Sequence, residues 1–222
     1  MGGSNGDRLF CFWFTSMMLK AVAAVSAELC KVCPPREQTV QMIAEMFERK
    51  TVLDEIVFVQ FDTPPINPIW GEFQRYRRQP SVYASFNTVA EIRYAMHLLD
   101  RIDWLRFVVT KELCHALEAP TGQHEVENGT MDGLVTKFSL YSHARELGPV
   151  AAAYELEILA EIAAVELLCP VAIREAYLVE HGAPNADAYT ELAKHHNLPL
   201  SVIHGAFDAS YNSSIRDLLN GH

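Results

Sequence analysis

A glutamate and a histidine in this chain have the spacing of a zinc-binding helical motif. Residues 107–116 read FVVTKELCHA, so Glu112 and His115 match the last two functional positions of His-Glu-x-x-His. In that motif two histidines four residues apart share one helix face and bind zinc, while the glutamate acts as general base on the metal-bound water. The segment therefore offers one general base, Glu112, and one metal ligand, His115.

Lys111 stands at the first position of the motif, where a histidine would bind the metal. A protonated lysine has three N–H donors and no lone pair, so it cannot coordinate zinc. Coordination requires a neutral lysine, and burial beside a metal ion would lower the pKa of Lys111 in that direction. A protonated Lys111 would instead supply the site with an internal cation.

A second group of acidic residues lies on an apolar helix predicted for residues 151–168, which Pro170 ends. Apolar residues on most faces are typical of a buried helix, and buried carboxylates are costly unless they are paired or bound to a metal. The helix contains Glu155, Glu157, Glu161 and Glu166. We expect Glu112, His115 and Glu157 to converge where the two helices cross, around zinc or around the ammonium group of Lys111.

The elements that position these residues indicate an α+β fold, mostly helical, with a short antiparallel sheet of about three strands before the motif helix. Apolar periodicity and breaker residues predict the element ranges. Helices are expected at 36–50, 90–99, 103–118, 151–168, 172–181, 186–197 and 201–219. Strands are expected at 56–61, 70–76 and 82–86, and a polar loop at 119–133.

The composition favours one globular domain in 222 residues, half of them hydrophobic. The net charge of −10 argues against direct binding of nucleic acid, because phosphate contacts need clustered Lys and Arg. The one compact basic patch, Arg75 to Arg78, is interpreted as a solvated face or as a contact for an acidic partner. No segment has the ~18 apolar residues of a membrane span.

Five scattered cysteines favour a reducing, cytoplasmic location over a disulfide-bonded secreted fold. Cys30 and Cys33 have CxxC spacing, which on its own is a weak signal for zinc or redox chemistry. Residues 1–35 are predicted to form a packed or flexible helical extension before a domain at 36–222. The alternative is a secretory signal, because Leu9 to Leu19 is apolar and Val25 to Ala27 would suit signal peptidase.

Two sequence blocks resemble the ImmA/IrrE family. The first is Arg106 to His115, RFVVTKELCH, and the second is Glu157 to Pro170, ExxAxxAAVELLCP in outline. The usual form in that family is R-F-x-x-A-H-E-x-x-H followed by E-x-x-A-x-x-F-A-x-E-L-L-M-P. The resemblance covers the chain from Arg36 onward, and Lys111, Ala163 and Cys169 are departures from it.

This resemblance implies a small zincin-like domain. It also implies a zinc-dependent peptidase activity that relieves a regulon by cleaving a repressor. Transferred residue by residue, Glu112 would be the general base, and His115 and Glu157 would be the second and third zinc ligands. Lys111 argues against zinc as the cofactor, because it replaces the first ligand.

Three hypotheses follow. The first is a degenerate, non-catalytic relative of ImmA/IrrE that binds a regulatory protein partner. The second is an active zinc peptidase with a non-standard ligand set that recruits Glu118, His124 or His143. The third is an ordinary amphipathic helix with a satisfied polar histidine, and it predicts that His115 and Glu157 need not lie side by side.

Overall fold

The computed structural model describes residues 5–62, 70–117 and 149–220, with side chains from residue 17 and, after the second gap, from residue 156. The α+β class is present: helices are combined with a small three-stranded sheet. The helices are α1 Asn5–Val32, α2 Val40–Lys50, α3 Ile102–Cys114, α5 Pro149–Leu168, α6 Val171–His181, α7 Ala186–His196, α8 Leu200–Ala206 and α9 Ala209–Asn220. The strands are β1 Glu55–Phe61, β2 Gly71–Arg78 and β3 Asn87–Ala95. Short 3-10 helices span Pro35–Glu37, Met96–Asp100 and His115–Leu117.

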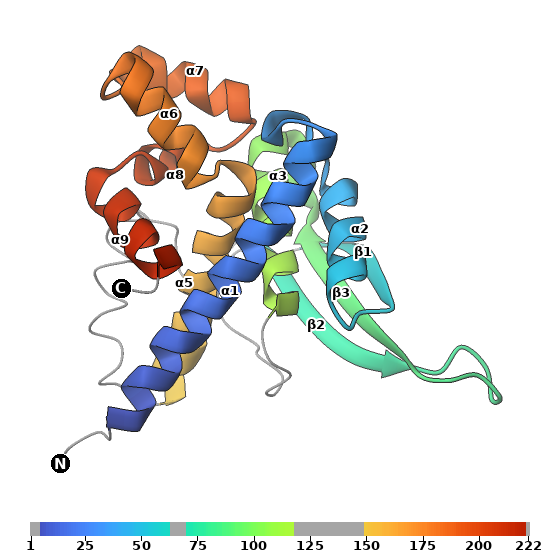
Figure 1. The fold of residues 1–222 in the computed structure, drawn as a ribbon. Coiled ribbons are helices and arrows are strands. Elements are labelled where there is room, and N and C mark those ends of the chain that lie inside the picture. The colour runs from blue at the N-terminus through green and yellow to red at the C-terminus, as the bar shows by residue number, and fades with distance from the viewer. Residues whose placement is uncertain (1–4, 63–69, 118–148, 221–222) are drawn as a thin grey trace.

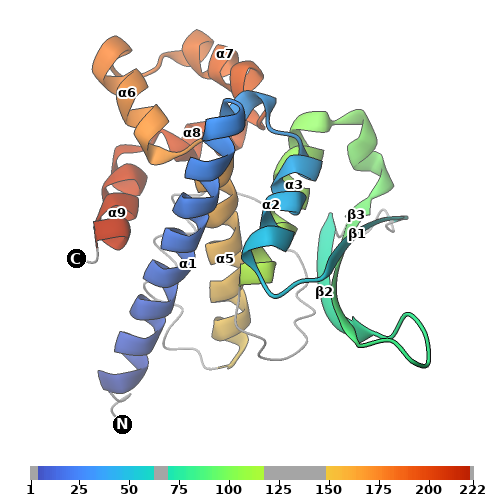
Figure 2. The same ribbon diagram turned by 45° about the vertical axis from the view of Figure 1, so that its right-hand side comes forward.

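Helix α3 lies between the sheet and α5. It packs against β2 and β3 on one side and against α5 on the other, while α1 runs along α5 (Figures 1 and 2). The helices α6 to α8 gather at the C-terminal end of α5, and α9 lies on the side of α5 away from the sheet (Figure 2). This arrangement buries both the motif helix and the acidic helix in the centre of the described structure.

The sheet is mixed, so the prediction of an antiparallel sheet is wrong for one of its two strand pairs. The strand order is β1-β3-β2, with β2 antiparallel to β3 and β1 parallel to β3. The chain enters β2 on one side of the sheet and returns through the centre as β3. Because β3 follows β2 through a hairpin connection, the β2–β3 pair is antiparallel. The other edge of β3 pairs with β1, in the parallel direction.

The third strand was predicted in the wrong place. Residues 82–86 lie in the connection between β2 and β3, and the range 90–99, predicted as a helix, contains most of β3 and a 3-10 turn. Val89, Ala90 and Ile92 in β3 are fully buried. A central strand hydrogen-bonds on both edges, and this pairing overrides the helix-forming tendency of its Ala, Glu and Arg residues.

Helices α5, α6 and α7 confirm the predicted ranges within one or two residues at each end. The helix predicted from residue 36 begins at Val40, because the Thr39 side chain caps it by accepting from the Met42 N–H at 3.2 Å. The helix predicted for 201–219 is split into α8 and α9. Asp208 lies between them and accepts a hydrogen bond from the Ser210 N–H at 2.8 Å, which starts the second helix.

Helix α1 is packed against the rest of the protein. Leu19, Val22, Val25 and Leu29 are buried in the same core as the central helices, whereas Val32 at the end of the helix is exposed. The division into an extension of 1–35 and a domain of 36–222 stays a prediction. No helix within the described residues is long and apolar enough to cross a membrane.

Candidate functional site

Helix α3 is buried along nearly its whole length because it is covered on two sides. From Arg106 through Ala116 every residue is buried, including the polar Thr110, Lys111 and Glu112. The α-helix ends at Cys114, and His115 begins the short 3-10 helix that follows. The polar residues of the motif therefore lie in the interior, where each needs a partner.

Lys111 finds its partners in two carboxylates. Its Nζ lies 2.6 Å from Oε2 of Glu157 on α5 and 2.9 Å from Oε1 of Glu112. The side chains of Lys111 and Glu112 are 6% and 3% exposed, and that of Glu157 is 19% exposed. The ion pair between Lys111 and Glu157 that the sequence predicts is present in the structure.

His115 joins the same group. Its Nε2 lies 3.2 Å from Oε1 of Glu157 and 3.8 Å from Oε2 of Glu112, and its ring faces Phe73 of β2 at 5.9 Å between centroids. We call Lys111, Glu112, His115 and Glu157 the Lys111 cluster. His115 and Glu157 do lie side by side, which is the arrangement that the ordinary-helix hypothesis did not require.

The charges of the cluster shift its pKa values in different directions. Burial by itself would lower the pKa of Lys111, but Glu112 and Glu157 outweigh it and raise that pKa above its usual range. Burial would raise the pKa of Glu157, but Lys111 and His115 hold it well below its ordinary value. Burial raises the pKa of Glu112, despite the opposing effect of Lys111. A proton entering the cluster therefore binds Glu112 before Glu157.

These residues do not fit a zinc ion as they stand. The first ligand position holds an ammonium group whose pKa is raised, and that ammonium contacts the carboxylate expected to be the third ligand. Within the described side chains, no group of three or more His, Cys, Asp or Glu is arranged to hold a metal ion. The other proposed ligands, Glu118, His124 and His143, lie outside the described residues.

Strand β2 forms a wall of the cluster. A Cβ atom at Gly71 would lie 2.7 Å from both Glu112 Oε1 and Val108 Cγ1, so only glycine fits without a shift. Phe73, two residues further along β2, covers the His115 ring. Arg75, two residues beyond Phe73, donates to the Ala116 carbonyl at 2.7 Å. The strand is thereby fixed to the end of α3, where the cluster lies.

A second carboxylate of α5, Glu166, has its partners outside the Lys111 cluster. Glu166 accepts hydrogen bonds from Arg174 Nη2 at 2.8 Å and from the Val171 N–H at 3.0 Å. Arg174 is fully buried and also donates to Asn212 Oδ1 at 2.9 Å and to the Cys169 carbonyl. The Glu-Leu-Leu-Cys-Pro block therefore fixes the turn from α5 to α6. Glu161 is buried, and the Glu155 side chain lies outside the described residues.

Two buried arginines, Arg106 and Arg174, connect distant parts of the fold. No pattern in the sequence identifies the groups that they bind. Arg106, the first residue of the motif block, donates to the carbonyls of Pro35 and His196. It therefore ties α3 to the segment before α2 and to the end of α7. Arg174 lies outside both motif blocks, and the nearest clue to it was the unexplained carboxylate of Glu166.

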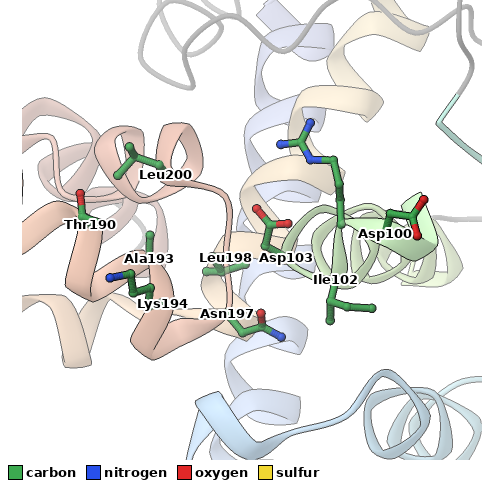
Figure 3. A pocket seen from close by; sticks show the side chains of 10 residues that line it. Asp100, Ile102, Asp103, Thr190, Ala193, Lys194, Asn197, Leu198 and Leu200 are labelled. Carbon is green, nitrogen blue, oxygen red and sulfur yellow. The ribbon is translucent and has the colours of Figure 1, made fainter. Parts of the chain in front are cut away.

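A groove of about 540 Å³ lies elsewhere, between the start of α3 and the α7–α8 turn. Figure 3 shows Asp100, Ile102 and Asp103 on one side and Lys194, Asn197 and Leu200 on the other. None of the residues of the Lys111 cluster lines this groove. Its charged groups have both signs, and the apolar side chains of Ile102 and Leu200 are 55% and 44% exposed.

No protein-family model, curated protein or solved structure matches this chain. The similarity to the ImmA/IrrE family therefore rests on the two sequence blocks alone. What the structure adds is the geometry of the residues in those blocks.

Proposed function

We propose that this protein is a non-catalytic relative of the ImmA/IrrE peptidases in which Lys111 takes the place of the metal ion, and that it acts by binding a regulatory protein partner. The observation that carries the proposal is the position of the Lys111 ammonium. It lies 2.6 Å from Glu157 and 2.9 Å from Glu112, between the two carboxylates that would otherwise serve a zinc ion.

The charge balance supports this proposal. Two carboxylates and an imidazole brought together in the interior need a positive charge, because an uncompensated buried carboxylate is strongly destabilising. Zinc supplies that charge in an active enzyme. Lys111 supplies it here from within the chain, so the fold is stable without a bound ion.

The state of Glu112 points the same way. A general base must be ionised and free to accept a proton from water. Glu112 is buried, and its Oε1 lies 2.9 Å from the Lys111 ammonium, so the carboxylate is held by an ion pair and is not free to take a proton from water. It is therefore poorly suited to the role of base that the motif would assign to it, and binding is the activity left to the fold. A protein partner follows from the resemblance, since members of that family act on repressor proteins.

The proposal is tested by the zinc content of protein purified without chelators and then supplied with zinc, measured by elemental analysis. We expect wild type to remain free of zinc and Lys111→His to gain about one equivalent, because the substitution restores a neutral imidazole ligand. Adding His115→Ala to Lys111→His should abolish that gain, which assigns the metal to this site.

The opposite result would support the alternative of an active zinc peptidase. In that case wild type would carry about one zinc that His115→Ala removes. It would also show proteolysis that Glu112→Gln abolishes. Ligands from the undescribed range 118–148, such as Glu118, His124 or His143, would then complete the site.

A further inference from the structure

Two thiols that do not belong to the Lys111 cluster lie at the C-terminal end of α1. Cys30 is exposed and Cys33 is partly exposed, and both are free cysteines. Cys33 directly follows the last helical residue, and its N–H still bonds to the Leu29 carbonyl at 3.1 Å. The helical spacing is therefore maintained as far as the second thiol.

This spacing is compatible with a disulfide. Residues three apart in an α-helix have Cα atoms about 5 Å apart, from a rise of 1.5 Å per residue and a radius of about 2.3 Å. Disulfides join residues whose Cα atoms are roughly 4.4–6.8 Å apart. Because Cys33 lies just beyond the helix, its side chain can turn toward Cys30 without unwinding the body of α1.

A buried glutamine links the two cysteines. Gln38 is 2% exposed, and its Nε2 contacts Cys30 Sγ at 3.7 Å and the Cys33 carbonyl at 3.3 Å. Its Oε1 is buried and has no hydrogen-bond partner among the described residues. The amide thus directs a donor toward sulfur. This suits a sulfur that accepts, as a thiolate or a disulfide sulfur does.

The position of Gln38 is itself fixed. Its N–H bonds to the Pro35 carbonyl at 3.2 Å, and that same carbonyl accepts from buried Arg106 of α3. The segment that carries the glutamine is therefore anchored to the centre of the protein. It holds the amide against the end of α1.

We propose that Cys30 and Cys33 form a redox-active dithiol that a small disulfide such as glutathione disulfide oxidises to an intramolecular disulfide. The Cys30 thiolate attacks one sulfur of glutathione disulfide, breaks its S–S bond and releases one glutathione thiolate. The Cys33 thiolate then attacks Cys30 Sγ, forms the Cys30–Cys33 bond and releases the second glutathione thiolate. The two released thiolates take up the two protons that the cysteines lost. The protein dithiol is oxidised and the glutathione disulfide is reduced.

The chain offers a direct assay, because Lys31 lies between the two cysteines. Folded full-length protein with Cys11→Ser is incubated with glutathione disulfide, alkylated to block free thiols, denatured and digested with trypsin. Cleavage after Lys20, Lys31 and Arg36 separates Cys30 on residues 21–31 from Cys33 on residues 32–36. An intramolecular disulfide leaves these two peptides joined, in protein that runs as a monomer on a non-reducing gel.

We expect the joined peptides in this protein and their loss in Cys33→Ser, which should accumulate glutathione on Cys30 instead. Gln38→Ala should slow the joining several-fold. Cys114 and Cys169, both fully buried, should remain reduced and serve as internal controls. The proposal is overturned if glutathione accumulates on Cys30 while Cys33 is present, or if both thiols stay reduced in excess glutathione disulfide.

Discussion

Lys111 differs from a metal ion in what it demands of its neighbours. Zinc fixes three or four ligands at about 2 Å and requires neutral or anionic donors. An ammonium needs only acceptors at hydrogen-bond distance, and Glu112 and Glu157 provide them at 2.9 Å and 2.6 Å. The pairing of Lys111 with Glu157 could be predicted because a carboxylate on an apolar helix needs a cation. The contacts of Arg106 could not, because their acceptors are main-chain carbonyls distant in the sequence.

Gly71 tests how closely β2 must approach the cluster. A methyl group there would meet Val108 and the carboxylate of Glu112, which is not free to move because it contacts Lys111. Gly71→Ala should lower the free energy of unfolding by about 1–3 kcal/mol, as overpacking of a core does. Urea denaturation measures the change. Gln74→Ala, at an exposed position of the same strand, is the matched control and should have little effect. Equal stability of the two variants would contradict the close approach.

His196 gives the protein a predictable response to acid. Burial, together with the positive charge of His195 and Arg106, lowers the pKa of His196 to about 4 from its ordinary 6.5. Its Nδ1 has no hydrogen-bond partner among the described residues. Between these two pKa values the unfolded chain binds a proton that the folded protein does not. Protonation of His196 therefore favours the unfolded chain in this range. The folded protein has its full stability above about pH 6.5 and loses part of it as the pH falls toward 4.

His196→Gln removes this titration while its main-chain carbonyl remains to accept from Arg106. Between about pH 6.5 and pH 4 wild type should lose on the order of 2–3 kcal/mol more stability than the variant. Urea denaturation across this range measures the difference, with both proteins sharing every other titrating group. Parallel curves for the two proteins would show that His196 does not titrate in this way.

At the scale of elements, the turn from α5 to α6 depends on the buried pair of Glu166 and Arg174. Glu166→Gln should lower the free energy of unfolding by about 3–5 kcal/mol, because it leaves the Arg174 guanidinium buried without its counter-charge. Urea denaturation measures the loss. Glu175→Gln breaks an ion pair with Arg216 on the surface and should cost less than about 1 kcal/mol. Similar losses for the two variants would contradict this account of the turn.

The helices were easier to predict than the sheet. The apolar helix α5 and the capped helix α7 carry their signals locally, in the Pro170 stop and in the Asn185 side chain that accepts from Ala188 at 2.9 Å. Strand β3 carries no such signal. Its identity depends on β1 and β2 pairing with both of its edges, which is a non-local property. The same reason explains why the parallel pairing of β1 was missed.

At the scale of the whole molecule, α1 supplies part of the central core and is not only an appendage. Leu29→Ala should lower the free energy of unfolding by about 2–5 kcal/mol, because it leaves a cavity where α1 packs. Val32→Ala, at an exposed position of the same helix, should change it by less than about 0.5 kcal/mol. Thermal or urea denaturation distinguishes the two. A small effect of Leu29→Ala would indicate that α1 is detachable.

The proposed function depends on Lys111 acting as the cation of the cluster, and a double-mutant cycle with Glu157 tests this role most directly. Unfolding free energies are measured for wild type, Lys111→Met, Glu157→Gln and the double variant. We expect Lys111→Met to cost about 3–5 kcal/mol, because it leaves the buried carboxylate of Glu112 and the partly buried carboxylate of Glu157 without their cation. The double variant should be more stable than the sum of the single losses predicts, by about 1–3 kcal/mol. Losses that add within about 0.5 kcal/mol would contradict the claim, because Lys111 and Glu157 would then not stabilise each other.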